Sequence, residues 1–161
     1  MAKMLYIEPS KCTGCRTCEL VCSIKNEGMA NPSLARIQVI AYKNRGIRVP
    51  LTCQQCEDPA CSAVCPTKAL TRNHGQGVVN HDKNKCIGCK VCVTACPFGA
   101  ITLNTNSRQI YKCEQCDGKP ECVRFCEDKA ITFVETDAIS GKKRRQTVQD
   151  LSRLLERYAT R

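Results

Sequence analysis

The chain has 161 residues, enough for one or two small domains, and its 25 Lys and Arg against 15 Asp and Glu give a formal charge of +10. It contains sixteen Cys and no Trp, and without the cysteines only about a third of its residues are apolar, so bound metals or disulfides should support a thin core. No apolar run approaches the length of a membrane span, so we expect no segment that crosses a membrane directly. Residues 1–10 lack the apolar stretch of a signal peptide, so we expect a cytoplasmic protein, with export on a partner's signal as the alternative.

The cysteines form four groups of four, here called packets one to four. Packet one is Cys12, Cys15, Cys18 and Cys22; packet two is Cys53, Cys56, Cys61 and Cys65; packet three is Cys86, Cys89, Cys92 and Cys96; packet four is Cys113, Cys116, Cys122 and Cys126. Packets one and three have the spacing C-x2-C-x2-C-x3-C, typical of bacterial [4Fe–4S] clusters, and packets two and four widen the middle gap. Zinc is the alternative, but structural zinc sites usually separate two C-x2-C halves by a longer loop. Because each cluster takes four thiolates, the count predicts four [4Fe–4S] clusters and an electron carrier.

Each packet has the same local design. Gly14 and Gly88 let the loops of packets one and three wrap closely around an inorganic cluster. The C-x3-C part predicts a short helical turn, which Pro66 and Pro97 end in packets two and three. A short strand is expected to begin in the Ala-Leu-Thr or Ala-Ile-Thr sequence at 69–71, 100–102 and 130–132.

An insertion, residues 26–52, separates packets one and two. Alternating apolar residues in 36–42, the turn Asn44-Arg45-Gly46 and a second run at 47–51 predict a β-hairpin. Ile37, Val39 and Ala41 should share one face. The insertion either shields packets one and four or has a further role.

The tail, residues 141–161, has a different composition. A basic run at 142–145 precedes 147–158, where apolar residues recur with helical periodicity. The expected apolar face consists of Val148, Leu151, Leu154, Leu155 and Tyr158. This helix either packs on its own chain or, as we favour, forms an arm that docks a partner subunit.

The positive charge has a simple interpretation. Each oxidised cluster with its four thiolates carries about −2, so four clusters bring the formal +10 down to about +2. We therefore interpret the basic residues beside the ligands as compensation for cluster charge and not as a nucleic-acid footprint; they are Lys11, Arg16, Lys85, Lys90, Lys112 and Arg124. His74 and His81 are expected to be solvated loop residues. No nucleophile–base pair or phosphate-binding loop accompanies the packets, so the chain is not expected to be catalytic alone.

The order and alternation of the packets resemble those of four-cluster ferredoxin-like electron-transfer subunits of the dimethyl sulfoxide reductase and formate hydrogenlyase type. The small soluble partners of carbon monoxide dehydrogenase and of tungsten aldehyde oxidoreductases are similar. The resemblance covers 11–134 and includes Asn-Pro-Ser-Leu-Ala-Arg-Ile at 31–37. It implies an α+β fold with two ferredoxin-like [4Fe–4S] dicluster modules, a β-hairpin insertion and a C-terminal helical arm. The outer module would be 1–52 plus 105–140, with the insertion at 26–52; the inner module would be 53–104, and the arm 141–161.

The resemblance also implies a crossed set of ligands, in which each packet gives three cysteines to one cluster and its fourth to another. Quartet one would be Cys12, Cys15, Cys18 and Cys126; quartet two would be Cys113, Cys116, Cys122 and Cys22; quartet three would be Cys53, Cys56, Cys61 and Cys96; quartet four would be Cys86, Cys89, Cys92 and Cys65. Some relatives replace one ligand, whereas every position here is Cys. Packets one and four depart from the pattern because Ser23 and Glu127 stand where packets two and three have proline.

The function implied is a relay of single electrons between a molybdenum- or tungsten-pterin catalytic subunit, with an aldehyde oxidoreductase favoured, and a flavoprotein, ferredoxin or similar acceptor. The alternatives are a free-standing polyferredoxin, or the electron-transfer subunit of a hydrogenase, formate dehydrogenase or carbon monoxide dehydrogenase. A metal-binding structural module is a weaker alternative. Two exposed ends of such a wire would also allow self-association.

Overall fold

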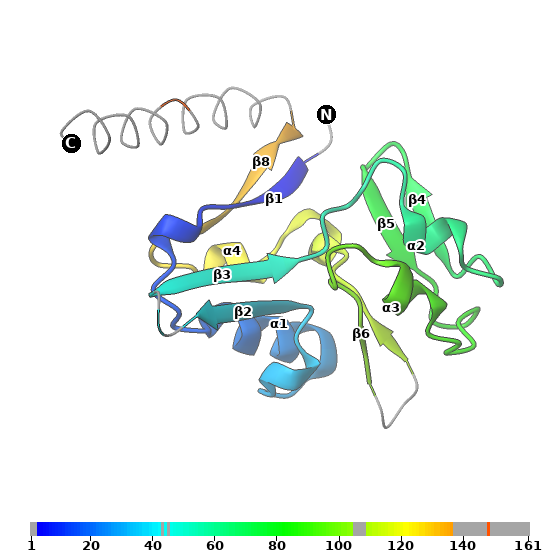
Figure 1. Ribbon diagram of the computed structural model, residues 1–161, viewed down its shortest axis with the longest axis horizontal. Helices are drawn as coiled ribbons and strands as arrows, with labels where there is room; N and C mark the ends of the chain where they lie inside the picture. Colours follow the sequence, from blue (N-terminus) through cyan, green and yellow to red (C-terminus); the bar gives the residue numbers. More distant parts are fainter. Residues whose placement is uncertain (1–2, 43, 45, 105–108, 137–147, 149–161) are drawn as a thin grey trace.

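The computed structural model describes residues 3–42, 44, 46–104, 109–136 and 148. Within these residues short helices combine with four two-stranded antiparallel sheets, so the α+β class expected from the sequence is confirmed (Figure 1). Apart from Val148, the predicted arm at 141–161 lies outside the described residues. None of the helices in the described part of the chain is long and apolar enough to cross a lipid bilayer.

The helices are short except for the first. They are α1 (Thr17–Glu27), α2 (Ala60–Ala63), α3 (Val91–Ala95) and α4 (Glu121–Arg124), with 3-10 turns η1 (Pro9–Lys11), η2 (Pro32–Leu34) and η4 (Gln115–Gly118). The strands are β1 (Lys3–Ile7), β2 (Ile37–Tyr42), β3 (Ile47–Thr52), β4 (Leu70–Asn73), β5 (Val78–His81), β6 (Thr102–Leu103), β7 (Ile110–Tyr111) and β8 (Ile131–Glu135).

Strands follow packets two, three and four as predicted. They are β4, β6 and β8, and each pairs with a strand that was not predicted from the sequence: β4 with β5, β6 with β7, and β8 with β1. The β1–β8 pair joins the two ends of the described fold, with Leu5 opposite Phe133. Packet one differs, because its helix continues and no strand comes directly after it.

The predicted hairpin is present as β2 and β3, with Ile37 opposite Thr52 and Tyr42 opposite Ile47. Of the predicted apolar face, Ile37 and Val39 are buried and Ala41 is exposed. The distal end of the hairpin extends beyond the core. Pro50 is tolerated within β3 because a two-stranded sheet leaves one edge of each strand unpaired.

Helix α1 is longer than the short turn expected for Cys18–Cys22. It spans 11 residues and ends at Gly28, which adopts a left-handed φ of 74° and donates its N–H to the carbonyl of Ile24. Ser23 has a backbone N–H and permits the helix to continue, whereas the proline after Cys96 has none. The missing proline in packet one therefore lengthens the helix.

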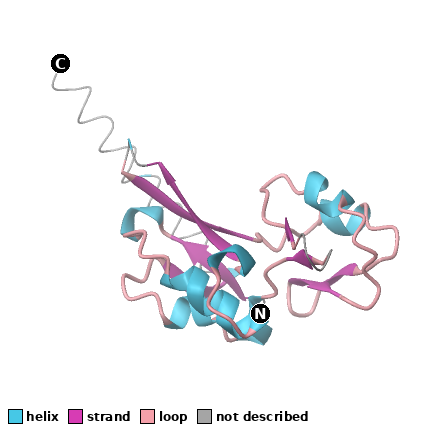
Figure 2. Cartoon of the chain, turned by 90° about the horizontal axis from the view of Figure 1, so that it is seen from below, coloured by secondary structure: helices cyan, strands magenta, loops and turns pink. Residues whose placement is uncertain are grey.

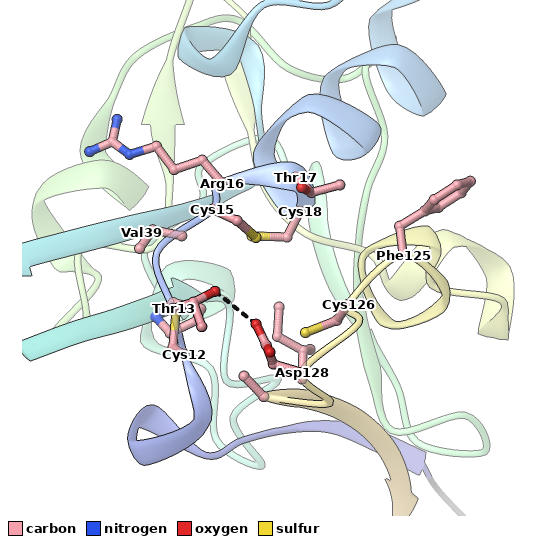
Figure 3. Close-up of a pocket in the computed structure, with 13 residues that line it drawn as sticks. Cys12, Thr13, Cys15, Arg16, Thr17, Cys18, Val39, Phe125, Cys126 and Asp128 are labelled. Carbon is pink, nitrogen blue, oxygen red and sulfur yellow. Dashed lines mark hydrogen bonds between the residues drawn. The ribbon is translucent and has the colours of Figure 1, made fainter.

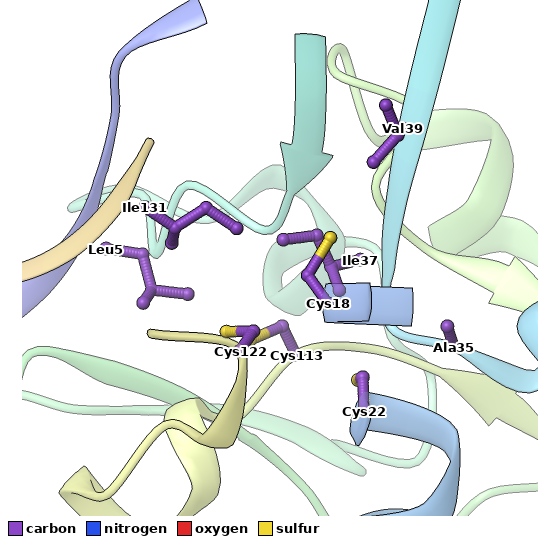
Figure 4. Packing of buried hydrophobic residues seen from close by; sticks show 9 residues of the cluster. All are labelled: Leu5, Cys18, Cys22, Ala35, Ile37, Val39, Cys113, Cys122 and Ile131. Carbon is purple, nitrogen blue, oxygen red and sulfur yellow. The ribbon is translucent and has the colours of Figure 1, made fainter. Parts of the chain in front are cut away.

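Cysteines make up a large part of both hydrophobic clusters. The first contains Leu5, Cys18, Cys22, Ala35, Ile37, Val39, Cys113, Cys122 and Ile131; the second contains Leu70, Val79, Cys92, Ile101 and Ile110 with Cys61, Cys65, Cys86 and Cys96 packed against it. Figure 4 shows the sulfur-bearing side chains of the first cluster among its aliphatic side chains. The elements around the first cluster and those around the second lie side by side in Figure 1 and remain distinct in the perpendicular view of Figure 2. Groups bound to these sulfurs would thus belong to the core itself.

Candidate metal centres

Packets one and three present their cysteines on the same backbone loop. Gly14 and Gly88 have φ of 78° and 67°, and the basic residues Arg16 and Lys90, two positions later, have φ of 61° and 67°. Two left-handed residues so close together curl the chain around the cysteines, and the helix then begins at the next residue. The left-handed backbone at position 14 favours glycine, and a Cβ there would also displace the exposed side chain of Arg48.

A second repeated turn comes after the fourth cysteine of packets two, three and four. The third residue after that cysteine is Lys68, Gly99 or Lys129, with φ of 52°, 59° and 51°. In each case its N–H donates to the carbonyl of the cysteine, at 3.1–3.2 Å. Packet four makes this turn with Glu127 in place of proline, so proline is not needed to form it.

The structure brings the cysteines of quartet one together. Cys12, Cys15, Cys18 and Cys126 line one cavity with about 320 Å³ of empty space, shown in Figure 3. The Thr13 hydroxyl donates to Asp128 at 2.7 Å and fastens the loop of packet one to the turn of packet four. Val39 and Phe125 also line the cavity.

Quartet two lines a second cavity with about 360 Å³ of empty space, formed by Cys22, Cys113, Cys116 and Cys122. Two backbone N–H groups donate to its sulfurs: Arg36 to Cys22 at 3.3 Å and Gln115 to Cys113 at 3.5 Å. The Asn26 amide donates to the Cys22 sulfur at 3.6 Å. Such hydrogen bonds stabilise negative charge on sulfur.

Quartet four lines a third cavity, again with about 320 Å³ of empty space and lined by Cys65, Cys86, Cys89 and Cys92. In quartet three, Cys61 lies within electrostatic range of Cys53, Cys56 and Cys96, and it packs on the same hydrophobic cluster as Cys96. Three similar cavities, each combining cysteines of two packets, point to one kind of occupant.

The donor set fits iron–sulfur clusters. Among the described residues no three His, Cys, Asp or Glu side chains converge closely enough for a single metal ion, so the sulfurs surround spaces and do not meet at a point. Soft thiolates are the ligands that iron–sulfur clusters take. The assignment of each cysteine to one cluster stays a prediction.

Burial raises the pKa of several cysteine thiols. It raises the pKa of Cys18 to about 12 and that of Cys92 to about 11, and it also raises the pKa of Cys122. Hydrogen bonds with Thr17 lower the pKa of Cys15, which is exposed. Because metals bind the thiolate, cluster binding must be coupled to ionisation of the buried thiols.

The basic residues beside the ligands are not equivalent. Four of the six pair with carboxylates of the chain itself: Lys11 with Glu8, Arg16 with Glu19, Lys85 with Asp82 and Arg124 with Glu121, at 2.8–4.0 Å. Their interpretation as compensation for cluster charge is therefore incomplete. Lys112 differs from all of these, since it is 1% exposed.

Sequence reasoning missed several polar residues around the sulfurs. Arg36 pairs with Glu27 at 3.6 Å and with Glu114 at 3.1 Å beside quartet two. The backbone N–H of His81 donates to Glu114 at 2.6 Å. His74 is exposed as predicted, but the prediction for His81 was wrong, because it ends β5, is half-buried, and has a pKa that burial lowers. No local sequence signal marks these contacts, which join segments far apart in the chain.

Comparison with known proteins places the cysteine packets in a wider context. Residues 45–136 match the family model described as a 4Fe-4S dicluster domain, and 9–28 match a 4Fe-4S binding domain. The polyferredoxin-like subunit of aliphatic sulfonate oxidoreductase from Pyrococcus furiosus is 40% identical, over 77% of this chain and 71% of that protein. One of the chains of anaerobic dimethyl sulfoxide reductase from Escherichia coli is 35% identical, over 85% of this chain and 75% of that protein. A chain of the active site complex BamBC of benzoyl coenzyme A reductase superposes with a TM-score of 0.50 at 26% identity, covering 83% of this chain and 76% of that one.

Proposed function

Since the chain belongs to the family of iron–sulfur electron-transfer subunits with 4Fe–4S dicluster domains, we propose that it relays single electrons between a molybdenum- or tungsten-pterin catalytic subunit and a flavoprotein, ferredoxin or similar acceptor. Its cofactors are four [4Fe–4S] clusters, to which its sixteen cysteines supply four thiolates each. Each bound cluster accepts and passes on one electron at a time. The chain's own residues hold the clusters, exclude water and fix the charges around them.

The observation that carries the ligand assignment is the grouping of cysteines around cavities. Quartets one, two and four each surround one space, and each combines three cysteines of one packet with the fourth of another. This crossed arrangement supports quartets one to four as the ligand sets. The two hydrophobic clusters likewise support two dicluster modules, 1–52 with 105–140 and 53–104, although β7 pairs with β6 of the inner module.

Exposure supports electron exchange at quartets one and four. Cys15 and Cys89 are exposed, whereas Cys22, Cys113 and Cys122 of quartet two are buried. The exposed aromatic Phe125 lies beside quartet one, and the exposed Ile87 lies beside quartet four. Partners would therefore meet the outermost clusters, with the central pair enclosed between them.

The chemistry of the substrate belongs, in this proposal, to the partner. The names of the similar proteins refer to sulfonate, dimethyl sulfoxide and benzoyl coenzyme A, although this one chain is similar to all three. We therefore propose that the chain does not catalyse a reaction alone and that it acts in the cytoplasm. An aldehyde-oxidising tungsten subunit is our favoured partner, on the sequence resemblance alone.

Anaerobic purification of the tagged full chain from its own cells tests this function. We expect a larger pterin-containing subunit to co-purify. That subunit, given its substrate, should reduce the clusters, and the reduction is measured as a loss of their visible absorbance. Iron and acid-labile sulfide should amount to four clusters per chain. Recovery of the chain without a catalytic partner, together with rapid exchange of electrons with diverse free enzymes, would favour the polyferredoxin alternative.

A further inference from the structure

Three lysines occupy the same sequence position, directly before the first cysteine of a packet. They are Lys11, Lys85 and Lys112. The side chains of Lys11 and Lys85 are 51% and 63% exposed and pair with Glu8 and Asp82. Lys112 is the one buried cationic side chain among the described residues, and no described carboxylate forms an ion pair with it. A buried cation without an anionic partner is costly, so its surroundings call for an explanation.

The ammonium of Lys112 lies where the two hydrophobic clusters meet. It donates to the carbonyl of Val79, which belongs to the second hydrophobic cluster. It also donates to the carbonyl of Cys113, which belongs to the first hydrophobic cluster, at 2.8 Å. Gln55 joins the same two segments, because its amide donates to the Cys113 carbonyl at 2.8 Å and its oxygen accepts from the Val79 N–H at 2.9 Å. The charge is thus fixed in place by neutral backbone acceptors.

The same ammonium is close to residues of two quartets. It donates to the carbonyl of Cys113, which belongs to quartet two. Burial raises the pKa of Cys53 and Cys61, both of quartet three, and in each the charge of Lys112 is the largest effect that opposes burial. Lys112 therefore lies between quartets two and three, at the crossing from one half of the molecule to the other.

Two other cations lie near the centre. Arg72 is only half-buried and donates to backbone carbonyls. Arg36 adjoins quartet two but pairs with both Glu27 and Glu114. Lys112 has only carbonyl acceptors, so the negative charge of the clusters is what remains to balance it. The reduction potential of a cluster depends on the charge around it, and a fixed charge in a low-dielectric interior acts more strongly than one in water.

We propose that Lys112 raises the reduction potentials of the two central clusters by holding an uncompensated positive charge between them. Reduction adds one negative charge to a cluster, so the ammonium favours the reduced state of both and keeps the crossing between the halves accessible to the electron. Lys112 acts here as a positioning and tuning residue, because it binds no iron. The inference rests on the proposed ligand sets.

The test compares Lys112→Gln and Lys112→Met with Lys112→Arg in the anaerobically prepared holoprotein, using redox titrations followed by electron paramagnetic resonance. Iron and sulfide analysis first establishes that each variant holds four clusters. We expect Lys112→Gln and Lys112→Met to lower the midpoint potentials of the two central [4Fe–4S] clusters, those of quartets two and three. The potentials of the other two clusters should not change. Lys112→Arg should keep all four potentials near those of the unmodified protein. The matched control Lys85→Gln should lower the midpoint potential of the [4Fe–4S] cluster of quartet four by a smaller amount. That shift in potential should decrease as salt is added, because Lys85 is exposed.

The electron paramagnetic resonance signals are assigned with two ligand variants. These are Cys116→Ser for the [4Fe–4S] cluster of quartet two and Cys61→Ser for that of quartet three. If these two variants do not alter separate signals, the proposed ligand sets fail, and this inference falls with them. If the two ligand variants do alter separate signals, the ligand sets stand. In that case the proposed role of Lys112 is overturned if Lys112→Gln shifts the potentials of the central clusters no more than Lys85→Gln shifts that of quartet four. If Lys112→Gln and Lys112→Met lose iron–sulfur clusters but Lys112→Arg does not, the positive charge at position 112 is needed, which supports the proposal. Loss of clusters in all three variants would contradict it.

Discussion

Packets one and three have the same ligand loop but differ in the structure that comes after it. The left-handed residues of the two loops have φ between 61° and 78° at matching positions. After packet one α1 runs for 11 residues, whereas after packet three α3 ends after five, before Cys96 and Pro97. The loop is therefore fixed by the motif, and the length of the helix by the residues C-terminal to the motif.

Contacts along the whole of α1 fasten the insertion to the ligands. Buried Glu19 accepts the N–H of Val39 at 2.6 Å, and the hydroxyl of Ser23 accepts the N–H of Asn31 at 3.0 Å. Glu27 pairs with Arg36 at the end of the helix. The same ligand motif is thus held by more contacts from the rest of the chain in packet one than in packet three. Removal of iron and single substitutions can test this difference between the two packets.

Removal of iron should have the largest effect and abolish the difference between the two packets. Without clusters both cores lose the groups that their cysteines surround, and a helix of 11 residues is marginal by itself. We expect an iron chelator under reducing conditions to remove most of the helical circular dichroism and the cooperative unfolding transition. Retention of α1 in the iron-free chain, shown by hydrogen exchange, would mean that its polar contacts suffice without clusters.

Ser23→Pro should give the next largest effect, because it places the proline of packet three at the matching position of packet one. Ser23 is fully buried within α1, and proline inside a helix costs about 3 kcal/mol or more. We expect a clearly lower midpoint of denaturant unfolding for the holoprotein. The reciprocal variant Pro97→Ser serves as the control and should change stability by less than about 1 kcal/mol. Equal effects of the two would show that α1 gains nothing from its extension.

Glu19→Ala should cost about 1–3 kcal/mol, because it leaves the buried N–H of Val39 without its acceptor. Glu19→Gln retains an acceptor oxygen and should cost less. Unfolding of the holoprotein measures both variants, and identical losses would indicate that the contact between α1 and the hairpin is not formed.

Lys11→Met should have the smallest effect. Lys11 and Glu8 form an exposed pair at 2.8 Å, and such pairs contribute about 0–1 kcal/mol. The unfolding midpoint should hardly move. A loss as large as that of Glu19→Ala would contradict the assignment of Lys11 to the solvated surface.

The sequence was informative where structure depends on short local patterns. The loops around Gly14 and Gly88, the hairpin and the strands after packets two to four were predicted from residues within a few positions of one another. The partner strands β1, β5 and β7 were missed because they are short and show no marked alternation, although Gly77 marks a turn before β5. The burial of Lys112 could not be predicted, since Lys11 and Lys85 occupy the same sequence context and are exposed. Only the packing of distant segments distinguishes them.

The crossed ligand sets are the central claim, and diffraction from crystals of the anaerobic holoprotein at the iron absorption edge tests them most directly. We predict four separate iron centres, each bound by three cysteines of one packet and the fourth of another, with Cys126 beside Cys12 and Cys22 beside Cys113. Four centres that each take all their sulfurs from a single packet would contradict the account.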